Sequence, residues 1–299
     1  MSFSADVKEE LSNIISSARH CQMAELAAFV GFCAVVKDSV QDGRTLTLIT
    51  DNELVKSKFF SLLNRTYGTD SEKSLSGEIC KSFLEGLRAI DEKGDIHLKG
   101  EPVSSILLKQ SCCKRAYLRG AYLCAGSMSD PKRSYHLEIV CDSKPQADQI
   151  IEVISSFDLE AKTTKRKDKY VVYIKESSAI VDFLGICEAH VALMEMENDR
   201  IVKEVRNTVN RRVNCEAANI SKTINASTRQ IEDIEYLRDN YGFNRLPDNL
   251  REMALIRLEF PDATLPELGA QFDPPLGKSG VNHRLRRLSE LADKERLHQ

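Results

Sequence analysis

The side chains with the clearest potential for binding chemistry lie near the carboxy terminus, in residues 274–289. This stretch contains four basic residues and no acidic one. Amide, imidazole and guanidinium groups are the ones that hydrogen-bond base edges in the major groove of DNA, so we expect Asn282, His283 and Arg286 to read bases. Phosphate contacts depend more on charge than on geometry, and for them we expect Lys278, Arg284 and Arg287.

A final helix from Gly280 to about Leu291 has to position these side chains, and Ser279 is its expected cap. One side of this helix is apolar and should pack against the preceding segment: Val281, Leu285, Leu288 and Ala292. The polar residues then project away from the packed side. The spacing therefore predicts an exposed recognition helix.

Two further helices are expected before it. One starts after Pro247 and stops at Pro261, and the next starts at Thr264, with Glu267 placed for a capping box. Helix, turn and helix in this order predict an all-α DNA-binding domain over residues 231–299, with its helix-turn-helix in residues 264–297. The alternative is a three-helix module that binds protein.

Two other basic segments are candidate phosphate contacts. The first is a predicted hairpin with Lys165, Arg166, Lys167 and Lys169. The second lies in a helical connector, residues 188–230, and contains Arg206, Arg211 and Arg212. The alternatives are a solvated hairpin tip and a solvated linker helix.

The amino-terminal part of the chain contains a duplication. Shifting the chain by 92 residues places the small, apolar run 118–126 on the run 26–34, and the strand, helix and polar turn that follow also correspond. Two α/β halves, residues 1–95 and 103–187, would pack their small-residue helices around a pseudo-two-fold axis. The fold class is therefore α+β: a duplicated α/β domain followed by an all-α domain. Acidic residues occupy the first half's counterpart of the basic hairpin: Asp70, Glu72, Glu78 and Glu85.

The two runs resemble degenerate LAGLIDADG helices of homing endonucleases, whose sheets form a saddle on DNA. In that family an acidic eighth residue on each helix holds divalent metal. The matching positions here are Cys33 and Ala125, which supply no carboxylate, and Glu25 and Asp130 lie several residues from the required places. An active endonuclease is therefore the disfavoured alternative, and we expect no enzyme activity.

Longer motifs resemble the WhiA family: residues 112–122, 210–215 and 265–288, in the family's order. This resemblance implies a transcriptional regulator of sporulation, cell division and chromosome segregation in a Gram-positive bacterium. It also implies double-stranded DNA and other transcription or cell-division proteins as partners. The operator, the target genes, the sign of regulation and the oligomeric state stay open. A ligand-sensing or protein-docking module with helix-turn-helix output is the alternative.

The composition limits other functions. The net charge is −3, so a signal for nucleic acid has to be local. There are nine cysteines, none in a C-x-x-C pair; Cys112 and Cys113 are adjacent, a poor geometry for joint metal binding, and the six histidines suggest no ligand cluster. We expect no metal, no cofactor, no membrane span, and a cytoplasmic protein associated with the nucleoid.

Overall fold

The computed structural model describes residues 2–39, 43–70, 73–90, 95–96 and 98–297 of the 299. The chain divides into two compact units, residues 1–203 and 204–299, each with its own apolar core. Among the described residues, no helix combines the length and apolar character needed to cross a bilayer.

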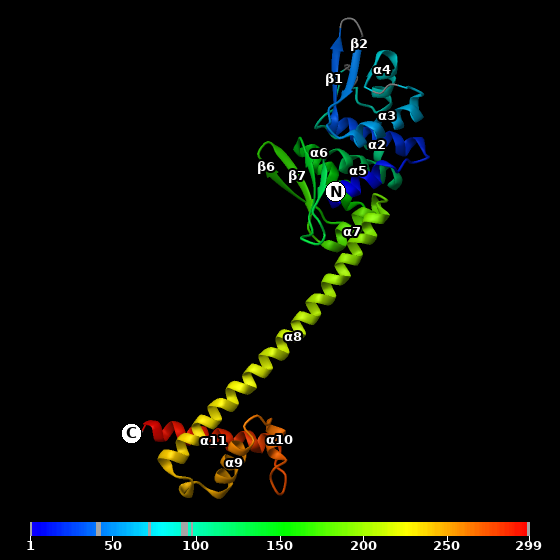
Figure 1. Ribbon diagram of the computed structural model, residues 1–299. Helices are drawn as coiled ribbons and strands as arrows, with labels where there is room; N and C mark the ends of the chain where they lie inside the picture. Colours follow the sequence, from blue (N-terminus) through cyan, green and yellow to red (C-terminus); the bar gives the residue numbers. More distant parts are fainter. Residues whose placement is uncertain (1, 40–42, 71–72, 91–94, 97, 298–299) are drawn as a thin grey trace. The chain divides into compact units, whose positions relative to one another are not determined.

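Two helices form the centre of the first unit: α2 (Arg19–Cys33) and α5 (Ser111–Ala125), which pack against each other (Figure 1). Their bounds differ by 92 residues at both ends, as the predicted duplication requires. The close approach depends on Gly120, where an added Cβ would lie 2.8 Å from Ala28 Cβ and 2.9 Å from the Glu25 carbonyl oxygen. The prediction that small residues let two backbones meet is confirmed.

Each helix leads directly into an antiparallel sheet. The first sheet has the order β1 (Ala34–Ser39), β2 (Gly43–Leu48) and β3 (Ser74–Ser76). The second has the order β4-β5-β7-β6, with bounds Gly126–Met128 for β4, Leu137–Cys141 for β5, Lys162–Arg166 for β6 and Lys169–Ile174 for β7. The alternating burial of β5 places Leu137, Ile139 and Cys141 in the core. The dipeptide Asp42-Gly43 is typical of a hairpin turn. Only Gly43 is among the described residues, as the first residue of β2.

Helices complete each half in the same order. The first half has α3 (Glu53–Tyr67) and α4 (Gly77–Gly86), and the second has α6 (Lys144–Ser155) and α7 (Ser177–Ile186). A short helix, α1 (Phe3–Ser12), precedes them, and a 3-10 turn, Ser105–Leu108, precedes α5. Apolar residues recur at helical spacing in each, for example Val55, Phe59 and Leu62 on α3.

The acidic counterpart of the basic hairpin was predicted incorrectly for two residues. Glu78 and Glu85 lie on α4, because Cys80, Phe83 and Leu84 form a buried helical face there. Asp70 lies just after α3, and Glu72 is outside the described residues. The polar turn expected after the helix of the first half is followed by a short strand, β3, which pairs with β2.

The second unit is helical. The helix α8 (His190–Tyr236) enters it, followed by α9 (Asp248–Glu259), α10 (Leu265–Gly269) and α11 (Lys278–Leu297), with two short turns between α8 and α9, Leu237–Tyr241 and Phe243–Arg245. The residues 188–230 expected as a connector lie mostly in α8. The predicted packing of the final helix is confirmed, since its apolar side is buried against Leu268 and Phe272.

Candidate nucleic-acid interface

A tight turn between α10 and α11 sets the direction of the final helix. The Leu276 N–H donates to the Gly269 carbonyl at 2.8 Å, and a Cβ at Gly269 would lie 2.0 Å from the Leu276 carbonyl oxygen, so glycine is required there. The predicted capping box of α10 is present, because the Glu267 carboxylate accepts from the Thr264 N–H at 2.7 Å. These contacts fix where α11 begins.

The helix α11 begins at Lys278, two residues earlier than predicted. The Gly277 carbonyl accepts from the N–H groups of Gly280 and Val281, at 2.9 and 3.1 Å. Ser279 is therefore inside the first turn instead of capping it. Its side chain is exposed, on the same turn as Lys278.

The exposed and buried residues of α11 separate as the periodicity requires. Val281 is 0% exposed and Leu285 and Leu288 are 1% exposed. The exposed set contains Lys278, Ser279, Asn282, His283, Arg286 and Arg287. A solvent-facing helix side that carries amide, imidazole and guanidinium groups has the donors and acceptors for major-groove contacts.

Arg284 has a different environment from its neighbours. Its guanidinium lies 4.9 Å from the centre of the Phe272 ring, 3.4 Å from the Asn249 carbonyl and 3.8 Å from a Glu252 carboxylate oxygen. The side chain is 23% exposed. Contacts with the Phe272 ring and α9 residues therefore hold Arg284 beside the packed side of α11.

The other two arginines share one acid. Arg286 Nε lies 3.1 Å from Glu290 Oε1, and Arg287 Nη1 lies 3.5 Å from Glu290 Oε2. These are exposed pairs at helical spacing, which contribute little to stability. Exchanging the carboxylate for a base edge or a phosphate would therefore cost little free energy.

In the first unit, the predicted basic hairpin is present as β6 and β7, joined through Lys167 at a positive φ of 55° (Figure 1). Every residue of β6 is exposed, including Lys165 and Arg166. Two cations of the hairpin already have acidic partners: Arg166 lies 3.6 Å from Glu138, and Lys169 pairs with Asp142. The local field is therefore smaller than the count of lysines and arginines suggests.

The three arginines of the connector do not share a face. Arg206, Arg211 and Arg212 are exposed on α8. At about 100° per residue, they are separated by roughly 140° and 100° around the helix. One straight phosphate backbone cannot contact all three at once. Arg212 also lies 3.1 Å from Glu216.

The resemblance to LAGLIDADG helices predicts metal-binding acids at the ends of the two central helices. Cys33 is the last residue of α2 and Ala125 is the last residue of α5. A hydrogen bond with Cys124 lowers the pKa of the Cys33 thiol, and burial raises the pKa of Cys124 well above its ordinary value. Thiols and a methyl group are poor ligands for hard divalent cations.

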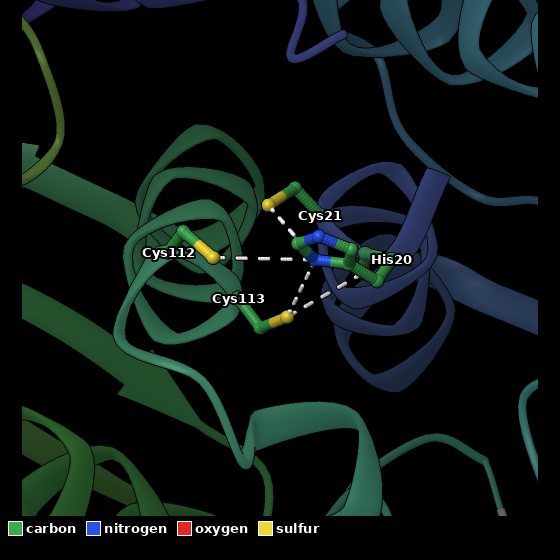
Figure 2. A group of neighbouring side chains, drawn as sticks. All are labelled: His20, Cys21, Cys112 and Cys113. Carbon is green, nitrogen blue, oxygen red and sulfur yellow. Dashed lines mark hydrogen bonds between the residues drawn. The ribbon is translucent and has the colours of Figure 1, made fainter. Parts of the chain in front are cut away.

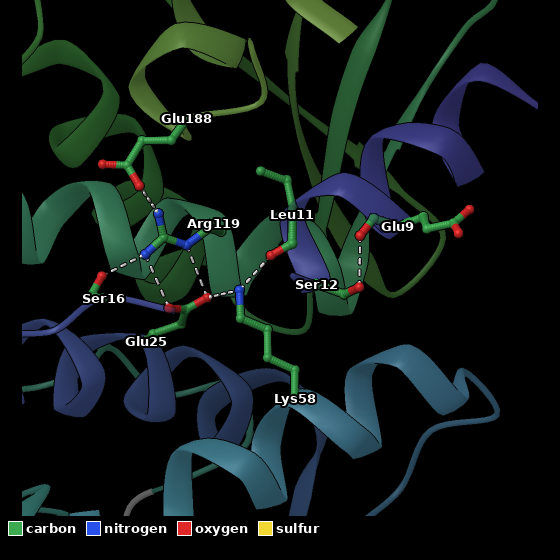
Figure 3. Close-up of polar contacts among 8 residues, drawn as sticks. All are labelled: Glu9, Leu11, Ser12, Ser16, Glu25, Lys58, Arg119 and Glu188. Atoms are coloured by element: carbon green, nitrogen blue, oxygen red, sulfur yellow. Dashed lines mark hydrogen bonds and ion pairs between the residues drawn. The ribbon is translucent and has the colours of Figure 1, made fainter. Parts of the chain in front are cut away.

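Glu25 has a structural role that the sequence did not suggest. Its carboxylate lies 2.6 Å from Lys58 Nζ and 3.1 Å from Arg119 Nε, and all three side chains are at most 1% exposed (Figure 3). Arg119 also contacts Glu188 at 2.6 Å. The two partners of Glu25 lie 33 and 94 residues away in the sequence, so no local pattern predicts the cluster. Its one trace in the sequence is a charged residue in or beside each apolar run.

Comparison with known proteins decides the family. Family profiles described as the WhiA C-terminal HTH domain and the WhiA LAGLIDADG-like domain match residues 209–292 and 114–206. A protein named probable cell division protein WhiA, from Lachnoclostridium phytofermentans, is 45% identical over 312 residues, covering 98% of this chain and 99% of the relative. The chain belongs to the WhiA family.

Further WhiA proteins agree with this assignment. The relative of the same name from Alkaliphilus oremlandii is 44% identical, with 98% of each chain covered. The crystal structure of full-length WhiA from T. maritima is 25% identical, has a TM-score of 0.58 and covers 98% of this chain and 99% of that one. The predicted resemblance and the predicted fold class, a LAGLIDADG-like domain followed by a helix-turn-helix domain, are both confirmed.

Proposed function

We propose that this WhiA chain is a non-catalytic, sequence-specific DNA-binding protein that regulates transcription. The observation that carries the proposal is the exposed side of α11, where Asn282, His283 and Arg286 face solvent above a buried apolar side. In this proposal those three residues contact bases. The proposed phosphate contacts are Lys278 and Arg287, with Arg284 as a weaker contact because it is held beside Phe272.

The names of the relatives support a proposal about the biological role. The protein from L. phytofermentans is named a probable cell division protein. We propose the same role for this chain, exerted through the control of genes for division, sporulation and chromosome segregation. Such a role places the protein on the nucleoid in the cytoplasm.

The absence of catalysis is part of the proposal. Cys33 and Ala125 stand where the homing enzymes have metal-binding acids, and the Glu25 carboxylate is occupied by Lys58 and Arg119. Phosphodiester cleavage with a divalent metal requires oxygen ligands placed between the scissile phosphates. The side chains at the ends of α2 and α5 do not meet that requirement.

A protein partner is a second part of the proposal. One side of α8 carries branched apolar side chains that are each more than half exposed: Val205, Val209, Val213, Ile220 and Ile224. Such a row is typical of a helix side that packs against another helix. Sedimentation of the full chain and of a Val209→Lys, Val213→Lys variant tests a second copy of the chain as the partner. Loss of a dimer in the variant would support it, and a monomer in both chains would exclude it.

The direct test of the function is fluorescence anisotropy of the full chain on duplex DNA at several salt concentrations, with Mg²⁺ present and the DNA examined on a gel. We expect binding that weakens with salt and DNA that stays uncut. Cleaved DNA would contradict the non-catalytic assignment. An unchanged anisotropy at every salt concentration would contradict DNA binding.

A further inference from the structure

Four side chains with soft donor atoms meet at the amino-terminal ends of the two central helices. His20 and Cys21 lie in the first turn of α2, and Cys112 and Cys113 lie in the first turn of α5 (Figure 2). Their donor atoms all lie within 4.8 Å of one another. The imidazole nitrogen His20 Nδ1 is 3.2 Å from Cys113 Sγ, 3.3 Å from Cys21 Sγ and 4.0 Å from Cys112 Sγ.

The duplication explains why these residues meet. At the offset of 92 residues, His20 corresponds to Cys112 and Cys21 corresponds to Cys113. Two helices related by a pseudo-two-fold axis bring equivalent positions together. The sequence prediction that the histidines belong to no ligand cluster is therefore wrong for His20. Cys112 and Cys113 have their partners on α2, and their adjacency in the sequence does not reveal those partners.

Three cysteines and one histidine are a typical ligand set for structural zinc. With Zn–S near 2.3 Å and Zn–N near 2.0 Å, donor atoms of a tetrahedral site are about 3.5–3.8 Å apart. The present spacing needs movements of roughly half an ångström, which side-chain rotation provides. Cys21 and Cys113 are buried, whereas His20 and Cys112 are exposed, so a cation has a route from solvent.

Their environment makes the Cys21 and Cys113 thiols poor nucleophiles on their own. Burial and the neighbouring thiols raise the pKa of Cys21 to about 12, and burial also raises the pKa of Cys113. A bound divalent cation stabilises the thiolates, and the three thiol protons pass to solvent.

We propose that His20, Cys21, Cys112 and Cys113 bind one Zn²⁺ ion that ties α2 to α5. The site is at the opposite ends of these helices from Cys33 and Ala125, so it is separate from the positions that hold metal in homing enzymes. Its role is structural: all four protein ligands close a tetrahedral set and leave no position for substrate. The metal fixes the packing of the two halves.

Elemental analysis and cobalt substitution of the full chain test this proposal. We expect one zinc per chain after purification without chelators. After stripping and reloading with Co²⁺, we expect the absorption of tetrahedral thiolate-bound cobalt. Chelation should lower the Tm of the first unit, because an ion that binds only the folded state stabilises it.

Matched variants separate this site from other thiols. Cys21→Ser with Cys113→Ser should abolish the thiolate-to-cobalt band, and Cys215→Ser, an exposed cysteine on α8, should leave it unchanged. His20→Asn changes an exposed residue and should fold, yet lose tight binding. His20→Cys should keep the ion and shift the spectrum towards that of a four-thiolate site.

Two results would overturn the proposal. One is a folded chain that binds no stoichiometric Zn²⁺ or Co²⁺, although all nine thiols react with a thiol reagent once the chain is unfolded and are therefore reduced. The other is a disulfide between Cys21 and Cys112 or Cys113, seen as a mass lower by two hydrogens, in a chain that still takes up no metal after reduction. That outcome would make the cluster a redox pair.

Discussion

Lys278 and the pair His283 and Arg286 differ in what they are expected to recognise, although all three are exposed on α11. A lysine contributes a compact charge that suits any phosphate. Lys278→Ala should weaken binding to all DNA sequences about equally and reduce the slope of log affinity against log salt by about one unit. Salt titration by fluorescence anisotropy measures both effects.

Lys294→Ala provides the control for this prediction. Lys294 is an exposed lysine in the last turn of the same helix, well beyond the residues expected at bases. The variant has the same change in net charge and should retain the wild-type slope. Equal slopes for Lys278→Ala and the wild type would remove Lys278 from the interface.

Glu25 offers a stability prediction at the same scale. Glu25→Ala leaves Lys58 and Arg119 buried without the carboxylate that balances them. Breaking a buried pair in this way costs about 3–5 kcal/mol, so urea unfolding of the full chain should show a clear loss of stability in the first unit.

Glu53→Ala is the matched control for that experiment. Glu53 pairs with Lys56 at 2.7 Å, but the glutamate side chain is 81% exposed. Exposed pairs are worth roughly 0–1 kcal/mol, so this variant should unfold near the wild-type urea concentration. A Glu25→Ala chain as stable as Glu53→Ala would show that the buried cluster does not hold the fold together.

The environment of a single residue was predictable from the sequence where it depends on one helix alone. The buried side of α11 followed from the spacing of Val281, Leu285 and Leu288 alone. The environment of Arg284 did not, because it depends on Phe272 and α9. Glu25 and His20 were missed for the same reason: their partners are on other helices, and no local pattern encodes a distance between helices.

At the scale of elements, the pairing of α2 and α5 depends on Gly120 more than on Gly31. Gly120→Ala would place a methyl 2.8 Å from Ala28 Cβ, whereas a Cβ at Gly31 has no neighbour closer than 3.8 Å. Overpacking should cost Gly120→Ala about 1–3 kcal/mol of unfolding free energy. Gly31→Ala should be neutral or stabilising, because alanine favours a helix over glycine. Thermal unfolding of both variants checks this, and equal Tm values would contradict the close helix contact.

The sequence predicted most elements because their signals were local and repeated. The offset of 92 residues located α2, α5 and the strands that follow them, and the prolines and Thr264 located the helices of the second unit. The segment after α3 was harder to predict. There, the three residues of β3 are too few to show alternation, and the acidic residues of α4 concealed the apolar side formed by Cys80, Phe83 and Leu84.

At the scale of the whole molecule, a net charge of −3 means that DNA contact has to come from local surfaces in one or both units. Lys165→Glu with Lys167→Glu reverses two charges on the β6-β7 hairpin. If the first unit contacts phosphates, this variant should bind several-fold more weakly at low salt. Lys56→Glu with Lys109→Glu makes the same charge change elsewhere in the first unit. Equal affinities for the two double variants would leave DNA binding to the second unit alone.

The most direct test of the central claim is the affinity of the full chain for a DNA site selected from random sequence, compared with its affinity for a scrambled duplex. Our account predicts a clear preference for the selected site in the wild type. His283→Ala with Arg286→Ala should remove most of that preference, about 1–3 kcal/mol for each lost base contact, and should change binding to the scrambled duplex far less. An equal loss on both duplexes would contradict base reading by α11.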